Sequence, residues 1–297
     1  MKVLVFGSSG MLAWKVIELL LNTKIFTVTS TIRKNSDKLL IKNKIKLSKN
    51  LKFIKFDAML YKRYQLRNMI NKYDVIINCI GVIKPNINEE KNNSIINAIK
   101  INSIFPRDLF NLKKKNIKVL QIATDCVFDG QIGNYNEEAK HNATDIYGKS
   151  KSLGEVKGNN FFNLRCSIIG EEIKNKKSLI SWFLSHKSEE KIHGYVNHIW
   201  NGITTTAFAK IIIGIIKHKF YNLPNIIHIL PRNTVSKFQL LKRLKLHYQK
   251  KNNINQSLAS IKIDRSLSSK FYLINEKIWK LAGYRKIPTI NYLIDEI

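Results

Sequence analysis

Short apolar runs rich in β-branched residues alternate with segments of helical length along the first half of the chain. Near-continuous runs of this kind lie at residues 3–6, 26–31, 51–56, 75–80, 117–124 and 161–164. Segments such as 11–21 and 61–71 place apolar residues at the spacing of an amphipathic helix. Because the short runs are apolar throughout, they predict strands that are covered on both faces of a sheet.

This alternation predicts an α/β fold of the Rossmann type, with a doubly wound parallel sheet and helices on both faces. Right-handed crossovers bring the carboxyl ends of the strands to one edge of the sheet, where ligands bind in such folds. Functional residues are therefore expected in the turns that follow the strands.

The alternation breaks after Arg165. The second half predicts a helix near 178–186, a loop at 194–202, a helix at 204–217 and a strand at 226–230. We expect a dinucleotide-binding Rossmann domain over residues 1–165 and a smaller C-terminal substrate-binding lobe, mainly residues 166–297. Residues 203–230 are expected to pack back onto the first domain. No low-complexity linker separates the two parts, which favours a shared interface with a cleft.

The chain carries a large positive charge, with 51 Lys and Arg against 21 Asp and Glu among 297 residues, a formal net charge of +30. The cations are spread along the chain without a helix-turn-helix, zinc-finger, RNA-recognition or K-homology motif. Lys, Asn and Ile are jointly abundant and share AT-rich codons, so solvated lysine faces in a protein of biased codon usage explain the charge. We expect no nucleic-acid partner.

Hydrophobic residues make up 44% of the chain, enough for a large core. The apolar run 211–216 is far shorter than the roughly 18–20 residues of a membrane helix, and the first residues lack the apolar region of a signal peptide. These features predict a cytoplasmic protein without a membrane span. The 3 Cys and 7 His show no spacing typical of metal ligands, so no metal site is expected.

A glycine-containing turn, G-S-S-G-M-L-A at residues 7–13, joins the first predicted strand to the first helix. Gly7 suits a tight turn, Gly10 lets a pyrophosphate approach the backbone, and Ala13 lets the helix pack closely. The N-terminus of that helix then faces the phosphates. This G-x-x-G-x-x-A spacing predicts a dinucleotide site. The expected contacts in the turn are Gly7, Ser9, Gly10, Met11 and Leu12.

The segment after the second predicted strand indicates which dinucleotide binds. An acidic side chain there would bind the ribose hydroxyls of NAD, but residues 29–34, T-S-T-I-R-K, contain none. Arg33 can instead make a charge-assisted contact with a 2′-phosphate, so the sequence predicts NADP(H). Residues expected to line the adenine and ribose positions follow the third and fourth strands: Asp57, Cys79, Ile80 and Gly81.

Tyr147 and Lys151 lie four residues apart in a segment that predicts the start of a helix, so one helix face carries both side chains. A phenol becomes a better acid-base group where an ammonium stabilises its phenolate. Thr124, at the end of the fifth predicted strand, adds a hydroxyl at the same sheet edge. The order of glycine turn, Thr124 and Tyr-x-x-x-Lys predicts a catalytic constellation.

With these motifs the chain resembles the extended short-chain dehydrogenases/reductases over nearly its full length, and within them the dTDP-4-dehydrorhamnose reductase family. Residues 122–130, I-A-T-D-C-V-F-D-G, are similar to that family's S-T-D-Y-V-F-x-G segment, and D-R-S-L at 264–267 and G-Y at 283–284 also resemble it. The resemblance implies that Thr124, Tyr147 and Lys151 are catalytic and that Asn102 helps to hold an active-site water.

The resemblance further implies hydride transfer from NADPH to the C4 carbonyl of a nucleotide-linked 4-keto-6-deoxysugar, as in dTDP-rhamnose and surface polysaccharide biosynthesis. Tyr147 would donate the proton, and Lys151 would bind the nicotinamide ribose and lower the Tyr147 pKa. Cys126 stands where the family has Tyr, so we expect a different sugar pocket. The expected substrate contacts are Asp125, Cys126, Val127, Phe128, Asn201 and Thr204.

Two other functions on the same fold remain open. A nucleotide-sugar epimerase or dehydratase would regenerate its cofactor in each cycle, although a dehydratase uses a carboxylate pair where this chain has Asp125 and Cys126. A non-catalytic NADP-binding regulatory subunit would be free to lose Thr124, Tyr147 or Lys151, so the intact set favours an enzyme. The expected partner is a nucleotide sugar, and a homodimer is a candidate assembly.

Overall fold

A parallel sheet of seven strands, in the order β11-β6-β5-β4-β1-β2-β3, forms the centre of the computed structural model, which describes residues 1–46, 48–174 and 176–297. Its strands are β1 (Lys2–Phe6), β2 (Thr27–Ile32), β3 (Leu51–Lys55), β4 (Val75–Asn78), β5 (Lys118–Ala123), β6 (Phe161–Arg165) and β11 (Ile226–His228). The chain order reverses beside β1, which makes a topological switch point between β1 and β4. The predicted α/β class with a doubly wound parallel sheet is confirmed.

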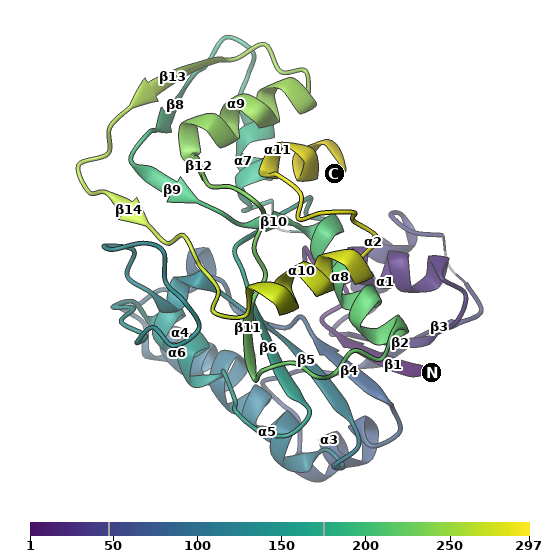
Figure 1. Ribbon diagram of the computed structural model, residues 1–297. Coiled ribbons are helices and arrows are strands. Elements are labelled where there is room, and N and C mark those ends of the chain that lie inside the picture. Colours follow the sequence, from purple (N-terminus) through teal and green to yellow (C-terminus); the bar gives the residue numbers. More distant parts are fainter. Residues whose placement is uncertain (47, 175) are drawn as a thin grey trace.

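Helices cover both faces of this sheet (Figure 1). They are α1 (Ala13–Asn22), α2 (Asn35–Lys42), α3 (Arg63–Ile70), α4 (Asn92–Ile99), α5 (Phe105–Leu112), α6 (Ile146–Leu153), α8 (Thr205–Lys217) and α10 (Tyr272–Leu281). Short helical turns lie at η1 (Lys84–Asn86), η2 (Lys100–Ile104) and η3 (Asp125–Val127). Ile17 and Ile212 belong to the core under α1, α8 and α10, and Leu66 and Leu109 to the core under α3 and α5. Within the described ranges, no helix is long and apolar enough to cross a membrane.

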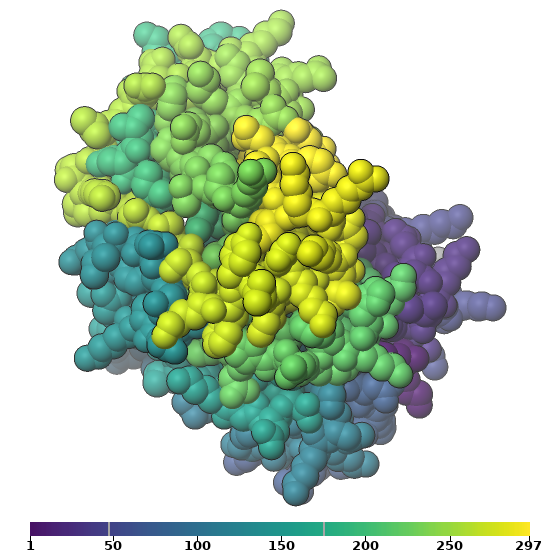
Figure 2. Space-filling view, in the orientation of Figure 1, coloured from purple at the N-terminus to yellow at the C-terminus, as the bar shows by residue number. Residues whose placement is uncertain are grey.

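The remaining elements gather at the carboxyl ends of the strands, at the top of Figure 1, around their own apolar cluster. They are β7 (Ile168–Ile169), α7 (Leu179–Ser185), β8 (Lys191–Tyr195), β9 (His198–Trp200), β10 (Ile203–Thr204), β12 (Val235–Ser236), α9 (Lys237–His247), β13 (Asn253–Ser257), β14 (Ile263–Asp264) and α11 (Ile290–Asp295). Figure 2 shows green and yellow-green residues of this group at the top of the molecule, above the blue and teal residues of the sheet domain. The chain returns to the central sheet through α8, which packs on α1, and β11, which pairs with β6.

The segment 194–202 is not the loop that the sequence predicted. It contains β9, which pairs antiparallel with β12 and parallel with β14. Three residues are too few to show an alternating pattern, and the partners of β9 lie more than 30 residues further along the chain, so no local signal marks this strand.

Close packing of α8 against the end of α10 supports a first prediction. Ala is normally the better helix former by about 1 kcal/mol. A Cβ on Gly214, however, would lie 2.6 Å from the carbonyl oxygen of Leu281. We expect Gly214→Ala to lower the free energy of unfolding by roughly 1–3 kcal/mol, measured by urea denaturation. Lys217→Ala, at an exposed position of the same helix, should change it little, and a stabilised Gly214→Ala variant would contradict this packing.

Candidate active site

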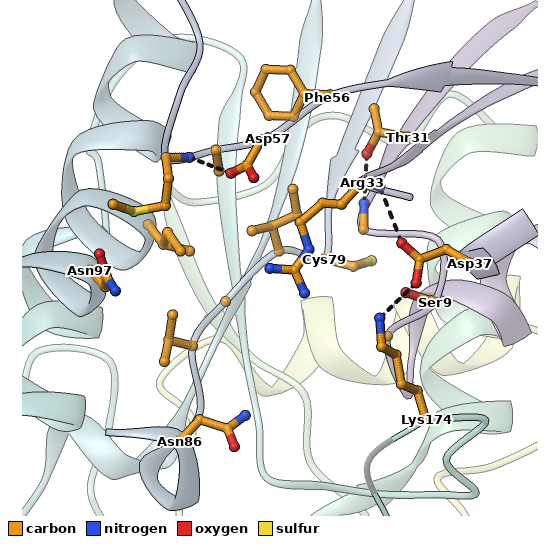
Figure 3. Close-up of a pocket in the computed structure, with 18 of the residues that line it drawn as sticks. Ser9, Thr31, Arg33, Asp37, Phe56, Asp57, Cys79, Asn86, Asn97 and Lys174 are labelled. Atoms are coloured by element: carbon orange, nitrogen blue, oxygen red, sulfur yellow. Dashed lines mark hydrogen bonds and ion pairs between the residues drawn. The ribbon is translucent and has the colours of Figure 1, made fainter. Parts of the chain in front are cut away.

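A cavity of about 380 Å³ lies beyond the carboxyl ends of β1, β2, β3 and β4 (Figure 3). It collects most of the cofactor contacts predicted from the sequence: Gly7, Ser9, Gly10, Arg33, Asp57, Cys79, Ile80 and Gly81. Met11 and Leu12 are not among its lining residues. Leu12 is buried at the start of α1 and packs into the core instead.

The glycine turn is shaped by the neighbouring strands. Gly7 has a φ of +88°, which favours glycine, and a Cβ there would lie 2.9 Å from Cγ1 of Ile80. The Gly7 amide donates to the Thr31 hydroxyl at 2.9 Å, and the Gly10 amide donates to the Gly7 carbonyl at 2.9 Å. The turn is therefore held against β2, with the N-terminus of α1 directed to the cavity.

Two charged residues that the sequence analysis missed, Asp37 and Lys174, also line the cavity. Asp37 accepts hydrogen bonds from the backbone amides of Arg33 (3.2 Å) and Lys34 (3.1 Å), and it pairs with the Lys174 ammonium at 2.7 Å. Burial raises the pKa of Asp37, but these donors outweigh it and hold the pKa below its usual value. The side chain of Arg33 extends into the cavity in Figure 3.

Helix α6 carries Tyr147 and Lys151 and begins at a defined N-cap. The Asp145 carboxylate accepts from the Gly148 amide at 2.7 Å and pairs with Lys84 at 2.8 Å. A Cβ on Gly148 would lie 2.3 Å from the Cys126 carbonyl oxygen, so the first turn of α6 packs directly on η3. This packing places the Tyr147 phenol beside the Thr124 hydroxyl.

Lys151 lies behind this pair. Its ammonium donates to the Ile122 carbonyl at 2.7 Å. A Cβ on Gly81 would lie 4.0 Å from the same Nζ, so α6 meets the cavity at Gly81. The three predicted side chains thus come together at the carboxyl end of β5, beside the cavity.

The predicted lowering of the Tyr147 pKa is not found. Removal from water raises the pKa of Tyr147, and the neighbouring Cys126, Asp125 and Asp145 add to the rise, while the Thr124 hydroxyl opposes it. Burial also lowers the pKa of Lys151 to about 8. The Lys151 ammonium is bound to a backbone carbonyl rather than to the phenol, so the phenol of Tyr147 is held in its protonated form.

Asn102 lies in the π-helical turn η2 and is buried. Its carboxamide accepts from the Val82 amide at 2.9 Å and donates to the Val82 carbonyl at 3.0 Å and to the Ser150 hydroxyl at 3.1 Å. The side chain therefore joins the loop after β4 to α6. Its predicted role in holding a water stays a prediction.

The predicted substrate contacts separate into two groups. Asp125 and Cys126 lie beside Thr124 in η3, and the Asp125 carboxyl has the cations Arg265 and Lys237 near it. Burial raises the pKa of Asp125, and the two cations oppose that rise.

The other four are committed to packing or capping. Val127 and Phe128 are buried in a cluster with Tyr135 and Leu267. The Asn201 carboxamide makes two hydrogen bonds to the Leu267 backbone, at 2.7 and 2.9 Å. Thr204 caps α8 by accepting from the Ala207 amide at 3.3 Å. In this structure Val127 and Phe128 are buried in an apolar cluster, and the polar atoms of Asn201 and Thr204 bond to the protein backbone.

A buried cation, Arg165, lies next to the end of α6. Its guanidinium pairs with the Glu155 carboxylate and contacts Nε2 of His228 (2.9 Å) and Nε2 of His141 (2.7 Å). Because a guanidinium only donates, both Nε2 atoms accept and both histidines are neutral. The Nδ1–H of His228 then donates to the Ser268 carbonyl at 2.6 Å.

Histidine, cysteine and carboxylate side chains are the usual protein ligands of a metal ion. Across the described ranges 1–46, 48–174 and 176–297, no group of three or more such residues is arranged to hold an ion.

The neutral His228 makes stability depend on pH. Burial, and then the Arg165 charge, lower the pKa of His228 well below 6.5. Below about pH 6.5 the unfolded chain therefore takes up a proton that the folded chain does not, so the free energy of unfolding falls as the pH falls. We expect His228→Gln to remove roughly 1–2 kcal/mol of the decline between pH 6.5 and 5 in urea titrations. The exposed His218→Gln should keep the wild-type slope, and an unchanged slope in His228→Gln would contradict the network.

Comparison with known proteins was made on the sequence and on the fold. The dTDP-4-dehydrorhamnose reductase of Clostridium acetobutylicum has a TM-score of 0.70 at 18% identity, over 100% of this chain and 98% of that chain. The reductase of the same name from Bacillus anthracis, in complex with NADP, has a TM-score of 0.68 at 19% identity, over 99% and 97%. UDP-glucuronic acid 4-epimerase from Bacillus cereus, in complex with NAD, has a TM-score of 0.74 at 14% identity, over 99% and 94%.

A search of curated proteins found no match. The solved structures show the fold, which reductases and epimerases share. The model of one sequence family, described as the RmlD substrate binding domain, matches residues 1–283 and so spans both the cavity and the catalytic helix. The chain belongs to the RmlD substrate binding domain family.

Proposed function

We propose that this protein reduces the C4 carbonyl of a nucleotide-linked 4-keto-6-deoxysugar with NADPH, as a dTDP-4-dehydrorhamnose reductase does. The observation that carries the proposal is the meeting of Thr124, Tyr147 and Lys151 at the end of β5, next to the cavity behind the glycine turn. Two structures of dTDP-4-dehydrorhamnose reductases share the fold over nearly the whole chain, one of them in complex with NADP. With this cofactor and substrate, the activity belongs in the cytoplasm.

The residues of the cavity fit a phosphorylated dinucleotide. The positive φ of Gly7 allows the tight turn that directs the N-terminus of α1 toward the place of a pyrophosphate. Among the described residues, the Arg33 guanidinium forms no ion pair. It is therefore free to bind a 2′-phosphate.

The protonation states suit reduction rather than oxidation. A bound NADPH supplies the hydride. As the substrate oxygen gains charge, the Thr124 hydroxyl and the protonated Tyr147 phenol donate hydrogen bonds to it, and Tyr147 gives up its proton. The Lys151 ammonium, whose pKa burial lowers to about 8, lies behind Tyr147 on the Ile122 carbonyl and would bind the nicotinamide ribose.

The substrate side offers cations from the C-terminal lobe. Lys237 begins α9 and Arg265 follows β14, and both lie near Asp125. We place the diphosphate of the nucleotide sugar near these two cations, and the sugar beside Asp125 and Cys126. In this proposal residues 1–165 with 203–230 form the cofactor-binding domain, to which Lys174 adds one side chain at the cavity, and the rest of 166–297 holds the substrate.

An assay with defined substrates tests the proposal. We expect the purified protein to oxidise NADPH, followed at 340 nm, when a dTDP-linked 4-keto-6-deoxysugar is added, with the UDP-linked analogue run in parallel. Dependence on one of the sugars supports the reductase. Conversion of a nucleotide sugar without net NADPH oxidation would favour an epimerase or dehydratase, and NADPH binding without turnover of any sugar would favour a regulatory subunit.

Removal of the Tyr147 hydroxyl tests the proton donor. We expect Tyr147→Phe to lower kcat by at least about 100-fold, because a positioned general acid contributes about that much. The Kd for NADPH, measured by titration calorimetry, should stay within a factor of about two to three because the phenol does not line the cavity. Tyr272→Phe, at an exposed position, is the control. Near-normal turnover in Tyr147→Phe would refute this role.

A further inference from the structure

Two cations from distant parts of the chain lie at the same end of the cavity. Arg33 follows β2, and Lys174 follows β7 in the C-terminal half, 137 residues from its ion-pair partner Asp37. Figure 3 shows Lys174 reaching toward Ser9 and Asp37 while Arg33 crosses the cavity. This end of the cavity lies beyond β2, where the adenosine ribose of a dinucleotide binds in this fold.

The Asp37 carboxylate would oppose a 2′-phosphate if its charge were left alone. Only 1% of the residue is exposed, so water does little to screen the charge. One oxygen accepts from the two backbone amides of Arg33 and Lys34, and the other pairs with Lys174. Both oxygens are thus engaged, which makes the buried carboxylate a weaker acceptor for a ribose hydroxyl. The Asp37 carboxylate alone would favour NAD at this end of the cavity, and the Lys174 ammonium neutralises its charge.

The Lys174 ammonium can also donate further hydrogen bonds. It carries three N–H donors, and the described contacts use one of them, on Asp37. Its side chain is 30% exposed and lines the cavity, so the other donors can reach a ligand.

The approach of Lys174 is fixed by contacts of its own segment. The Trp14 indole donates to the Glu171 carbonyl at 3.1 Å, and Lys44 pairs with the Glu171 carboxylate at 3.4 Å. These two contacts tie the segment before Lys174 to α1 and to the end of α2. The ammonium therefore reaches the ribose end of the cavity from a fixed direction.

We propose that Lys174 is a specificity-determining residue, the second cation of a 2′-phosphate subsite formed with Arg33. The proposal rests on the nicotinamide cofactor of the proposed function, but not on the sugar that is reduced. Lys174 cancels the Asp37 charge and donates to the 2′-phosphate, whereas a dinucleotide without that phosphate gains nothing from it.

Binding of ligand pairs that differ only in the 2′-phosphate tests this inference without turnover. Titration calorimetry would compare NADP⁺ with NAD⁺, and adenosine 2′,5′-bisphosphate with AMP. We expect Lys174→Gln to weaken binding of both phosphorylated ligands roughly tenfold or more, and binding of NAD⁺ and AMP by less than about twofold. Lys176→Gln is the matched control, because it removes an exposed ammonium two residues further along the same segment without touching Asp37. It should leave both ratios unchanged.

Equal weakening of both members of each pair would overturn the inference, because Lys174 would then act on the shared phosphates or only hold its segment in place. No change in any affinity would overturn it as well. The background variant Asp37→Asn separates neutralisation from contact. Adding Lys174→Gln to it should still weaken NADP⁺ selectively, and full recovery of NADP⁺ affinity in the double variant would contradict a direct contact.

The outcomes also separate this inference from the reductase proposal. A wild-type protein that binds NADP⁺ selectively but reduces no sugar would keep the 2′-phosphate subsite and lose the assigned reaction. A wild-type protein that binds neither dinucleotide would overturn both.

Discussion

The Arg165 guanidinium has no exposed surface, and the substrate side of the fold depends on how that charge is satisfied. An isolated buried cation is very unfavourable, so the surrounding segments are constrained to supply acceptors. Glu155 supplies a carboxylate, and His141 and His228 supply neutral ring nitrogens. Phe128 lies against the guanidinium, 5.2 Å from ring centroid to Cζ. Such a pair adds little net stability over an apolar core, but loss of one partner is costly, so its value lies in position. It fixes the residues just after α6 relative to β6 and β11.

Helix α6 is accordingly held at both ends. At its start, Asp145 caps the first turn and Gly148 lets the backbone approach η3 closely. At its end, a Cβ on Gly154 would lie 1.9 Å from the Asn102 carbonyl oxygen, so the π-helical turn η2 packs on α6 without a side chain between them. Glu155 follows at once and is anchored by Arg165. Neighbouring groups thus set the axis and rotation of α6, and with them the position of Tyr147 beside Thr124. The contacts at both ends of α6 therefore hold the Tyr147 side chain in place.

Local patterns in the sequence predict the strands, the glycine turn and the helix that carries Tyr147 and Lys151, because each depends on residues only a few positions apart. The prediction that Lys151 lowers the Tyr147 pKa was wrong because burial, which spacing does not show, dominates both groups. The prediction that Asn201 and Thr204 contact the ligand rests on their polar character, which fits a backbone hydrogen bond or a helix cap equally well. For Thr204 a signal existed, since a Thr before an apolar helical run is typical of an N-cap. For Lys174 none existed, because its partner is 137 residues away.

Because carboxylates are few in this protein, each buried carboxylate strongly affects which cations stay available to ligands. With 51 cations against 21 acids, any cavity in this protein tends to attract anions, and that attraction cannot tell one anionic ligand from another. Selectivity between anionic ligands must therefore come from the few carboxylates and from the cations with which each of them interacts. Glu155, together with His141 and His228, occupies the donors of Arg165 and so keeps that charge structural. Asp37 uses only one donor of Lys174. Asp125 lies near two cations without an ion pair to either among the described residues. The placement of three carboxylates thus separates the cations that hold the fold from those that are available to ligands.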